Sequence, residues 1–401
     1  MALKSTYITA EEYCDSVRDG THDTPEPIES GYKLITGKHI KNGQIDASEA
    51  YNISEDDYDA INIRSRVEQW DVLLSMIGTV GESVLVRDIP NYAIKNLALF
   101  KCGGNSLKGK WLYYYLQSPY AKSMMISTMN GSSQQFLSLR KLRDFPILIT
   151  DKKRMSKVVD ILSAYDDLIA NNQKQIKLLE EAAQRLYKEW FVKLHFPGYE
   201  NVPVVDGVPE GWKKEDFSKI INIMSGGTPK TDNPNYYGGN IPFYTPKDSG
   251  EHFFAFQTEK YITEEGLENC NSRLYPVNTV IITARGTVGN LALLAVPMAM
   301  NQSCFALKSD KLDAPYYLFF AVHKEIEAFK KMANGGVFDT IVLRTFDNIK
   351  MTIPNKNIVK NFEETVKPIM EQIKIKIKLN LTLSEARNRL LPKLMSGEIE
   401  V

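Results

Sequence analysis

The sequence lacks the features that mark secreted and membrane proteins. Its most apolar stretch, LALLAVPMAM at 291–300, is too short and too interrupted by proline to span a bilayer. The N-terminus, MALKSTYITAEEY, has no basic segment followed by an apolar run, so it does not resemble a secretory signal. These absences favour a cytoplasmic protein.

Recognisable metal and catalytic motifs are also missing. The 4 cysteines include no CxxC pair, which argues against a disulfide framework or a zinc ribbon and predicts buried thiols. The 5 histidines show no HExxH or similar ligand spacing, and no G-x-S-x-G segment occurs. We therefore expect no bound metal and no catalysis by this chain.

An excess of positive charge is missing as well. The 401 residues include 49 Lys+Arg and 49 Asp+Glu, and 43% are hydrophobic, which suits two or three globular domains. A chain that binds nucleic acid unaided is normally basic, because its cations replace the counterions of the phosphates. Any DNA-binding role must therefore rely on local basic residues or on partners.

Two stretches approach known motifs without completing them. GNSLKGKW at 104–111 nearly spells a phosphate-binding loop, but Trp111 stands where Ser or Thr would hold Mg²⁺. DNPNY at 232–236 resembles the box with which amino-methyltransferases grip a flipped base, but Asn235 replaces a proline. We expect a surface turn at the first stretch and an Asx-Pro turn at the second.

What the sequence does contain is a long internal repeat. GTVG occurs at 78–81 and again at 286–289. Two segments that open with Asn-Gly, at 130–149 and 334–353, share a Leu-Arg pair at an interval of 204 residues, and EAAQRL at 181 matches EARNRL at 385 at the same interval. Segments in the same order with one small insertion indicate a tandem duplication of a domain-sized unit.

Each copy is expected to hold one mixed globular domain followed by one long helix, in an α+β fold. Short β-rich runs flank both GTVG turns, whose glycines are expected to adopt positive φ. The expected parts are a first domain at 1–150, a first helix at 151–198, a linker at 199–210, a second domain at 211–354 and a second helix at 355–401.

The first predicted helix carries an apolar seam. From Val158 to Trp190 the seam residues follow alternating steps of four and three, with one polar interruption at Asn172. A helix over 154–190 would be about 55 Å long, and Phe196-Pro197-Gly198 would end it. It could lie on its own domain, but its length favours another long helix as partner. The residues expected to pack are Leu162, Tyr165, Ile169, Ile176, Leu179, Leu186 and Trp190.

The second predicted helix, at about 356–395, contains a conflicting signal. From Ile373 to Leu383 apolar and polar residues alternate strictly, a period of two that is typical of a strand. We still expect a helix, because the flanking segments and the duplicated counterpart are helical in pattern. Its packing residues are expected to include Ile373, Leu383 and Leu390.

This organisation resembles the specificity subunit of type I restriction-modification enzymes over essentially the whole chain. The resemblance is carried by the helix endings AQRLYKEWF and ARNRLLPKLMSGEIEV, by VPEGW at 208–212, by the paired GTVG turns and by NQSCFAL at 301–307.

The resemblance implies a division of labour. Each globular domain would be a target recognition domain that reads one half of a bipartite double-stranded DNA site. The two helices would form an antiparallel coiled coil with pseudo-twofold symmetry, which sets the gap and docks two modification subunits. The modification subunits would use S-adenosylmethionine to methylate adenine, and restriction subunits would add cleavage that needs ATP and Mg²⁺. This chain would bind no cofactor.

DNA contacts are expected from local basic residues and from loops at equivalent places in the two copies. ITGKHIKNGQ at 35–44 and YTPKDSGEHF at 244–253 are such loops, and a basic excess runs over 138–157. The candidates are Lys38, His39, Lys41, Gln134, Arg140, Lys141, Lys247, Asp248, His252, Arg285 and Arg344.

Two other functions stay open at this point. One is a coiled-coil adaptor without DNA specificity, which fits the neutral charge. The other is a self-contained DNA methyltransferase, which the lack of a cofactor loop disfavours.

Overall fold

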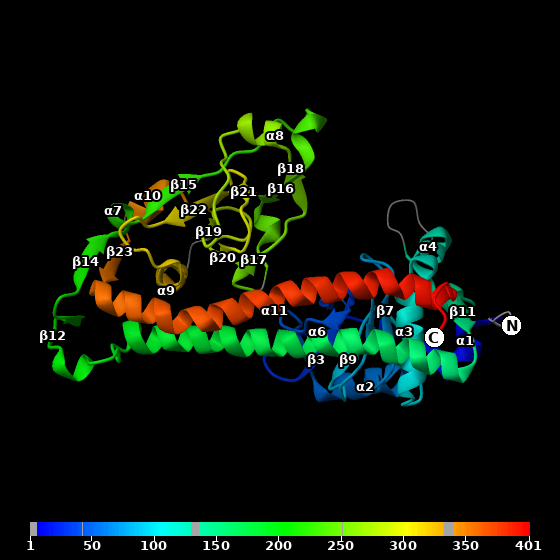
Figure 1. Ribbon diagram of the computed structural model, residues 1–401. Helices are drawn as coiled ribbons and strands as arrows, with labels where there is room; N and C mark the ends of the chain where they lie inside the picture. Colours follow the sequence, from blue (N-terminus) through cyan, green and yellow to red (C-terminus); the bar gives the residue numbers. More distant parts are fainter. Residues whose placement is uncertain (1–5, 42, 130–135, 251, 333–339, 348) are drawn as a thin grey trace. The chain divides into compact units, whose positions relative to one another are not determined.

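The computed structural model describes residues 6–401 apart from 42, 130–135, 251, 333–339 and 348 (Figure 1). The chain divides into two compact units. Unit 1 comprises Met1–Ile169 with Thr382–Val401, and unit 2 comprises Ala170–Leu381. Each unit therefore holds one mixed domain and a stretch of each of two long helices.

Within its described residues, unit 1 contains four groups of strands around short helices, one of which is the short pair β4 (Ile40–Lys41) with β5 (Gln44–Ile45). An antiparallel pair, β1 (Thr6–Thr9) with β11 (Pro146–Ile149), joins the start and the end of the domain. The main sheet has the order β2-β10-β7-β8, and a second sheet has the order β6-β3-β9, in which β3 and β9 run parallel. These strands are β2 Ser16–Asp19, β10 Leu97–Lys101, β7 Val72–Ser75, β8 Ser83–Leu85, β6 Asn52–Ile53, β3 Tyr32–Ile35 and β9 Tyr92–Ile94.

Unit 2 repeats this topology. The pair β14 (Lys213–Asp216) with β23 (Lys350–Ile353) matches β1 with β11. The main sheet has the order β15-β22-β19-β20-β17, and the second sheet has the order β18-β16-β21, again with a parallel pair, β16 and β21. These strands are β15 Asn222–Ser225, β22 Cys304–Lys308, β19 Val280–Thr283, β20 Leu291–Leu294, β17 Phe254–Ala255, β18 Lys260–Ile262, β16 Tyr237–Tyr244 and β21 Ala299–Met300.

Shorter helices fill out both domains. In unit 1 these are α1 Ala10–Tyr13, α2 Glu55–Ser65, α3 Ser106–Gln117, α4 Pro119–Thr128 and α5 Leu139–Arg143. In unit 2 they are α7 Phe217–Ile220, α8 Glu264–Glu268, α9 Pro315–Met332 and α10 Leu343–Asp347. The duplication in sequence is thus a duplication of fold.

The core of each unit includes the long helices. In unit 1 the buried Trp111 of α3 packs in one cluster with Val158 and Leu162 of α6, and its indole N–H donates to the Leu148 carbonyl at 2.7 Å. In unit 2 an aromatic cluster around Tyr187 and Phe362 joins α6, α9 and α11, and Figure 1 shows α9 beside α11. Burial of these faces is the main force that holds each domain on its helices.

The first long helix, α6 (Lys152–Tyr187), has 36 residues and is about 54 Å long. It starts near the predicted residue but ends earlier as an α-helix than expected. A π-helical turn, η2 (Lys188–Val192), follows it, and Leu194 has a φ of 64°. The helical chain therefore stops before Phe196-Pro197-Gly198, because the wider turn and the left-handed residue redirect it first.

The second long helix, α11 (Lys356–Ser396), is continuous over 41 residues. The helix prediction for 373–383 is therefore confirmed, although the alternation there suggested a strand. Ile373 and Ile377 are buried, whereas Ile375 is 55% exposed and Leu379 is 44% exposed. The alternation places half of these apolar residues in water, since residues four apart share one face of a helix and residues two apart do not.

Within each unit the two helices run antiparallel. In unit 1 Arg154 of α6 donates to the Leu394 carbonyl of α11 at 3.0 Å, and Asp166 pairs with Arg387. In unit 2 Asn172 Nδ2 donates to Asn380 Oδ1 at 2.9 Å. In the part of the chain that is described, no helix is long and apolar enough to cross a membrane.

Candidate nucleic-acid interface

In unit 1 a short capped turn follows the parallel strand β3. The turn is η1 (Gly37–His39), and its last side chain folds back on the preceding residue. His39 Nδ1 accepts from the Thr36 backbone N–H at 3.0 Å, and the His39 N–H donates to the Thr36 carbonyl at 3.0 Å. Burial, with the nearby ammonium of Lys38, lowers the pKa of His39, which favours the neutral imidazole that can accept this bond.

Unit 2 has the same turn after the parallel strand β16. Here the turn is η5 (Pro246–Asp248), and Asp248 takes the role that His39 has in unit 1. Asp248 Oδ2 accepts from the Thr245 N–H at 2.8 Å and from the Thr245 hydroxyl at 2.7 Å. Its other oxygen accepts from the Glu259 N–H at 2.7 Å. The two turns are therefore one structure built with different capping side chains.

Each GTVG segment closes an antiparallel hairpin, between β7 and β8 in unit 1 and between β19 and β20 in unit 2. All four glycines have positive φ, 80° and 89° in the first copy and 78° and 81° in the second, as predicted. The backbone bonds also repeat: Gly81 N–H donates to the Ser75 carbonyl at 3.0 Å, and Gly289 N–H donates to the Thr283 carbonyl at 2.8 Å.

The capped turn lies against the GTVG hairpin in each unit. In unit 1 a Cβ added to Gly37 would stand 2.6 Å from Ser75 Oγ, so the turn approaches the end of β7 closely. In unit 2 Thr287 Oγ1 donates to the Pro246 carbonyl at 3.2 Å, and Ser249 Oγ is hydrogen-bonded to Thr287 Oγ1 at 3.0 Å. Turn and hairpin are therefore in contact and form one surface element, which we call the turn-hairpin element (36–39 with 75–82, and 245–249 with 283–290).

The structure separates the loop candidates into outward and inward side chains. Lys38, Lys247 and Arg285 are exposed on the turn-hairpin elements. His39 is buried, with 3% of its surface exposed, and the carboxylate of Asp248 is occupied by its three backbone and hydroxyl donors. These positions argue against base contacts by His39 and Asp248, because both side chains are used to hold their turns.

The remaining candidates are spread over both units. Lys41 pairs with Asp46 at 3.0 Å, and His252 faces Glu180 of α6 at 3.6 Å, so it is directed at a helix rather than outward. Lys141 donates to the Thr128 carbonyl, whereas Arg140 is exposed on α5. Arg344 is exposed on α10, the counterpart of α5. Gln134 lies outside the described residues.

The helix residues singled out from the sequence differ in burial. Leu162, Ile176 and Ile373 are fully buried. The others are half-buried: Tyr165, Ile169, Leu179, Leu186, Trp190, Leu383 and Leu390.

The two incomplete motifs form a capped helix start and a turn. Most of 104–111 is the first part of α3 rather than a surface turn, and the Asn105 side chain caps that helix by accepting from the Lys108 N–H at 3.1 Å. The Lys108 ammonium pairs with Asp15 at 2.6 Å. At 232–236 the Asn233 side chain accepts from the Asn235 N–H at 3.1 Å, which is the predicted Asx-Pro turn.

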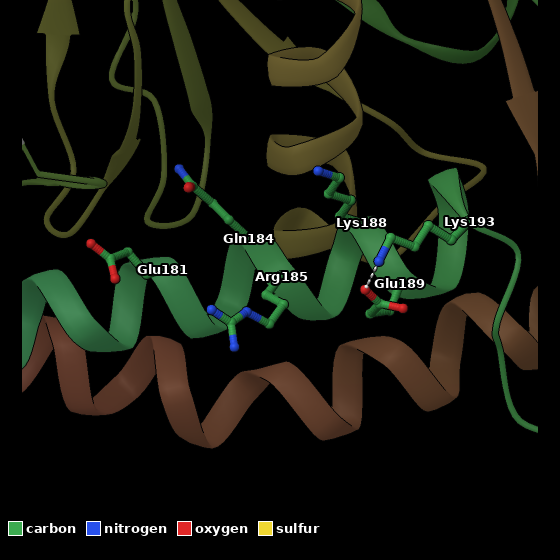
Figure 2. Close-up of a pocket in the computed structure, with 6 residues that line it drawn as sticks. All are labelled: Glu181, Gln184, Arg185, Lys188, Glu189 and Lys193. Carbon is green, nitrogen blue, oxygen red and sulfur yellow. Dashed lines mark hydrogen bonds and ion pairs between the residues drawn. The ribbon is translucent and has the colours of Figure 1, made fainter.

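A shallow groove of about 410 Å³ lies along the end of α6 and η2. Figure 2 shows its lining, which consists of Glu181, Gln184, Arg185, Lys188, Glu189 and Lys193. Lys193 pairs with Glu189 at 2.6 Å, a bond between neighbouring helical turns. The lining side chains are mostly charged, and the groove is open to solvent. Over the residues described, no group of three or more His, Cys, Asp or Glu is placed to hold a metal.

Comparison with known proteins shows the family. The sequence model of the type I restriction modification DNA specificity domain matches this chain twice, at residues 27–181 and 209–381. The chain belongs to this specificity family. The two matches fall in the two sequence copies, so the duplication seen in sequence and in fold is also two copies of one family domain.

Specificity subunits from several organisms are similar to this chain over most of their length. The HindI specificity subunit of Haemophilus influenzae is 24% identical, with 84% of this chain and 88% of that protein covered. The putative MjaX specificity subunit of Methanocaldococcus jannaschii is 21% identical, with 98% and 92% covered. The solved S subunit of a type I restriction-modification system from M. genitalium has the same fold, with a TM-score of 0.59 at 15% identity over 98% of this chain and 96% of that one.

Several structural residues of this specificity-family chain could not be identified from sequence. Arg154 belongs to the basic run that suggested DNA contact, yet it is 4% exposed and bonds the last turn of α11. Asp166 of α6 accepts from the Tyr114 hydroxyl at 2.7 Å and pairs with Arg87 at 3.3 Å. In the sequence, such residues appear only as charges at the edge of an apolar seam. Charged residues that face solvent have the same pattern, so the sequence does not distinguish the two.

Proposed function

We propose that this chain is the DNA-recognition subunit of a type I restriction-modification complex. The domains at 1–150 and 211–354 each read one half of a bipartite site. The helices at 151–198 and 355–401 form an antiparallel coiled-coil spacer with pseudo-twofold symmetry, and the linker at 199–210 connects the first helix to the second domain. The spacer sets the number of unread base pairs and docks two modification subunits.

The observation that carries this proposal is the turn-hairpin element, built twice on one repeated sheet topology. A repeated scaffold that presents different exposed residues suits two readers of two different short sequences. Exposed loops on a rigid sheet are where recognition residues are usually found, because the scaffold fixes them while their side chains can vary. The family membership supports the same role.

The spacer role rests on the antiparallel contacts within each unit. The duplication makes the two helices equivalent, and two equivalent helix faces related by a pseudo-twofold recruit two copies of one partner. Apolar residues such as Leu178, which is 64% exposed, and Ile375 lie on the helix surface of unit 2, where a partner can cover them. Modification subunits are the partner that fits.

The balanced charge is consistent with work in a complex. This chain would supply basic residues only where a groove or phosphate is touched, while the modification subunits supply the remaining phosphate contacts. It would hold no cofactor. S-adenosylmethionine would bind to the modification subunits, and ATP with Mg²⁺ would be used by the restriction subunits.

Two other functions compete with this one. A coiled-coil adaptor would need no exposed lysines at equivalent loop positions, which both units have. A self-contained DNA methyltransferase would carry an intact base-gripping box, whereas Asn235 interrupts the one that 232–236 resembles. Both observations favour the recognition subunit.

The test is modification-aware sequencing of host DNA with and without the gene for this chain. We expect a bipartite adenine-methylated motif with a fixed gap that disappears when the gene is deleted. Unchanged methylation with both partner subunits expressed would refute the proposal and support the adaptor. Binding of S-adenosylmethionine by this chain alone would support the self-contained methyltransferase.

A further inference from the structure

The two turn-hairpin elements share some exposed residues and differ in others. Lys38 and Lys247 are the exposed central residues of the two turns, and Thr79 and Thr287 are exposed in the two GTVG segments. The residue directly before GTVG differs, because it is Ile77 in unit 1 and Arg285 in unit 2.

The two lysines are held in the same way. The threonine before each turn has nearly the same backbone angles, φ −129° and ψ 175° at Thr36, and φ −131° and ψ 166° at Thr245. Each turn is closed by a side chain that folds back on that threonine. The backbone that carries Lys38 therefore matches the backbone that carries Lys247, although the capping residues differ.

Shared residues cannot make two domains read different sequences. The feature that two different half-sites have in common is the sugar-phosphate backbone, whereas the base edges differ. A lysine at the same place on both scaffolds is therefore suited to phosphate, which it binds as a point charge. An exposed position that differs between the scaffolds is suited to base choice.

On this basis, and resting on the proposed recognition function, we propose separate roles for the two positions. Lys38 and Lys247 bind phosphate oxygens and anchor each domain on the duplex. Ile77 and Arg285 contribute base choice, one in each half-site.

The side-chain chemistry of Ile77 and Arg285 predicts which base each would contact. Arginine can donate two hydrogen bonds to O6 and N7 of guanine in the major groove, and an apolar side chain can contact the methyl group of thymine. Arg285 is exposed, and Ile77 is 39% exposed. The second half-site is thus expected to contain a guanine read by Arg285, and the first a thymine beside Ile77.

The position before GTVG is also close to the turn. A Cβ added to Gly37 would lie 3.4 Å from the Ile77 carbonyl oxygen, and Ser75 Oγ donates to that oxygen at 3.1 Å. In unit 2 Thr287, which lies two residues after Arg285, is hydrogen-bonded to the Pro246 carbonyl and to Ser249. These bonds hold the Arg285 segment next to the turn that carries Lys247. Phosphate and base contacts from one element are therefore geometrically linked.

The first test measures DNA affinity at several salt concentrations. It uses the full chain in complex with its modification subunits, one duplex that carries the motif found by sequencing and one that lacks it. K38A and K247A should each reduce the magnitude of the slope of log K, where K is the DNA-binding constant, against log salt concentration by about 0.9. Each should also weaken binding to both duplexes by the same factor. K38R and K247R should keep the slope, and K213A, which removes another exposed lysine of unit 2, should leave it unchanged.

The second test sequences the methylated motif of each variant. In R285A the preference for one base over the others at one position of the second half-site should fall by about tenfold or more. The first half-site should be unchanged. I77A should act on the first half-site alone. K38A and K247A should leave both motifs unchanged.

The outcomes distinguish a failure of the two residue roles from a failure of the recognition function. A changed motif with an unchanged salt slope in K38A or K247A would overturn the phosphate role. Retention of both half-sites in R285A would overturn the base-reading role. If the wild-type complex had no salt-dependent affinity for either duplex, the recognition function itself would fail, and this would be seen before any variant is compared.

Discussion

At the scale of single residues, Asp166 is a junction within unit 1. Its carboxylate accepts from the Tyr114 hydroxyl of α3 and pairs with Arg87 and with Arg387 of α11. Its side chain is only 9% exposed, so these donors replace water. The neighbouring Asp167 is 60% exposed and pairs with Arg87 from the surface.

Removal of the Asp166 charge should therefore be costly. D166N should lower the free energy of unfolding by about 3 kcal/mol, because two guanidinium groups lose a buried partner. D167N is the matched control and should change it by less than about 1 kcal/mol, as expected for an exposed pair. Urea unfolding at neutral pH measures both. Equal shifts for the two variants would show that burial of Asp166 adds nothing.

Glu363 of α11 plays a comparable part in unit 2. Its carboxylate accepts from the backbone N–H of Tyr316 at 3.1 Å and of Tyr317 at 3.0 Å, and so caps the start of α9. Burial raises the pKa of Glu363 although these bonds act to lower it. The folded state therefore keeps a proton on Glu363 at a pH at which the unfolded chain has lost it.

The raised pKa of Glu363 determines how its contribution to stability changes with pH. A raised carboxyl pKa means that the folded state binds more protons than the unfolded state above pH 4.5, so its contribution to stability falls as pH rises through the folded pKa. Relative to E363Q, which cannot titrate, the wild type should gain stability as the pH is lowered from 7 toward 4.5. Urea midpoints of both proteins over this range provide the measurement. A difference that does not vary with pH would contradict the assignment.

At the scale of the element, the helix pair contains a polar pair, Asn172 with Asn380, within its apolar seam. Asn172 is 6% exposed and donates to Asn380 at 2.9 Å. The sequence marked Asn172 only as an interruption of the seam, and the structure supplies its partner from the other helix. A polar pair in a helix seam favours one alignment of the helices over others, because a shifted alignment leaves an amide against apolar atoms.

Substitution of this pair should show strong coupling. N172L should lower the free energy of unfolding by about 1 to 2 kcal/mol, since it removes a bond and sets an apolar group against an amide. N172L/N380L should recover most of this loss, because two apolar side chains then face each other. A double-mutant cycle in urea gives the coupling energy. Additive effects of N172L and N380L would exclude a functional pair.

The turn-hairpin elements contain glycines that are needed for two different reasons. The GTVG turns and their positive φ values were predicted correctly, because the need for left-handed backbone is a local property. Gly37 is different: its φ is ordinary, and an added Cβ would meet the Ser75 hydroxyl at 2.6 Å, so a side chain there would require a shift. That reason depends on the packing of a distant strand, and the pattern around residue 37 does not contain it.

At the scale of the whole molecule, the duplication predicts that recognition is modular. Exchange of 211–354 for the equivalent segment of another specificity subunit should replace the second half-site and keep the first half-site and the gap. The reason is that each turn-hairpin element is built within its own unit. Methylation sequencing of the exchanged protein gives the result. A changed first half-site would show that the two readers are not independent.

The sequence by itself determined the repeat, the apolar seams, the GTVG turns and the resemblance to the specificity family, because periodicity and local backbone demands are written in short stretches. The helix at 373–383 was predicted from its flanking segments. Its alternating pattern is explained by the structure, in which Ile373 is buried and Ile375 is exposed.

Only the tertiary structure decided which charged side chains remain exposed. His39 and Asp248 close their turns, Arg154 bonds the end of α11, and Lys38 and Arg285 stay in solvent, although all belong to similar polar stretches. A polar side chain takes its role from the donors and acceptors that meet it in the fold, and those come from residues far away in the chain.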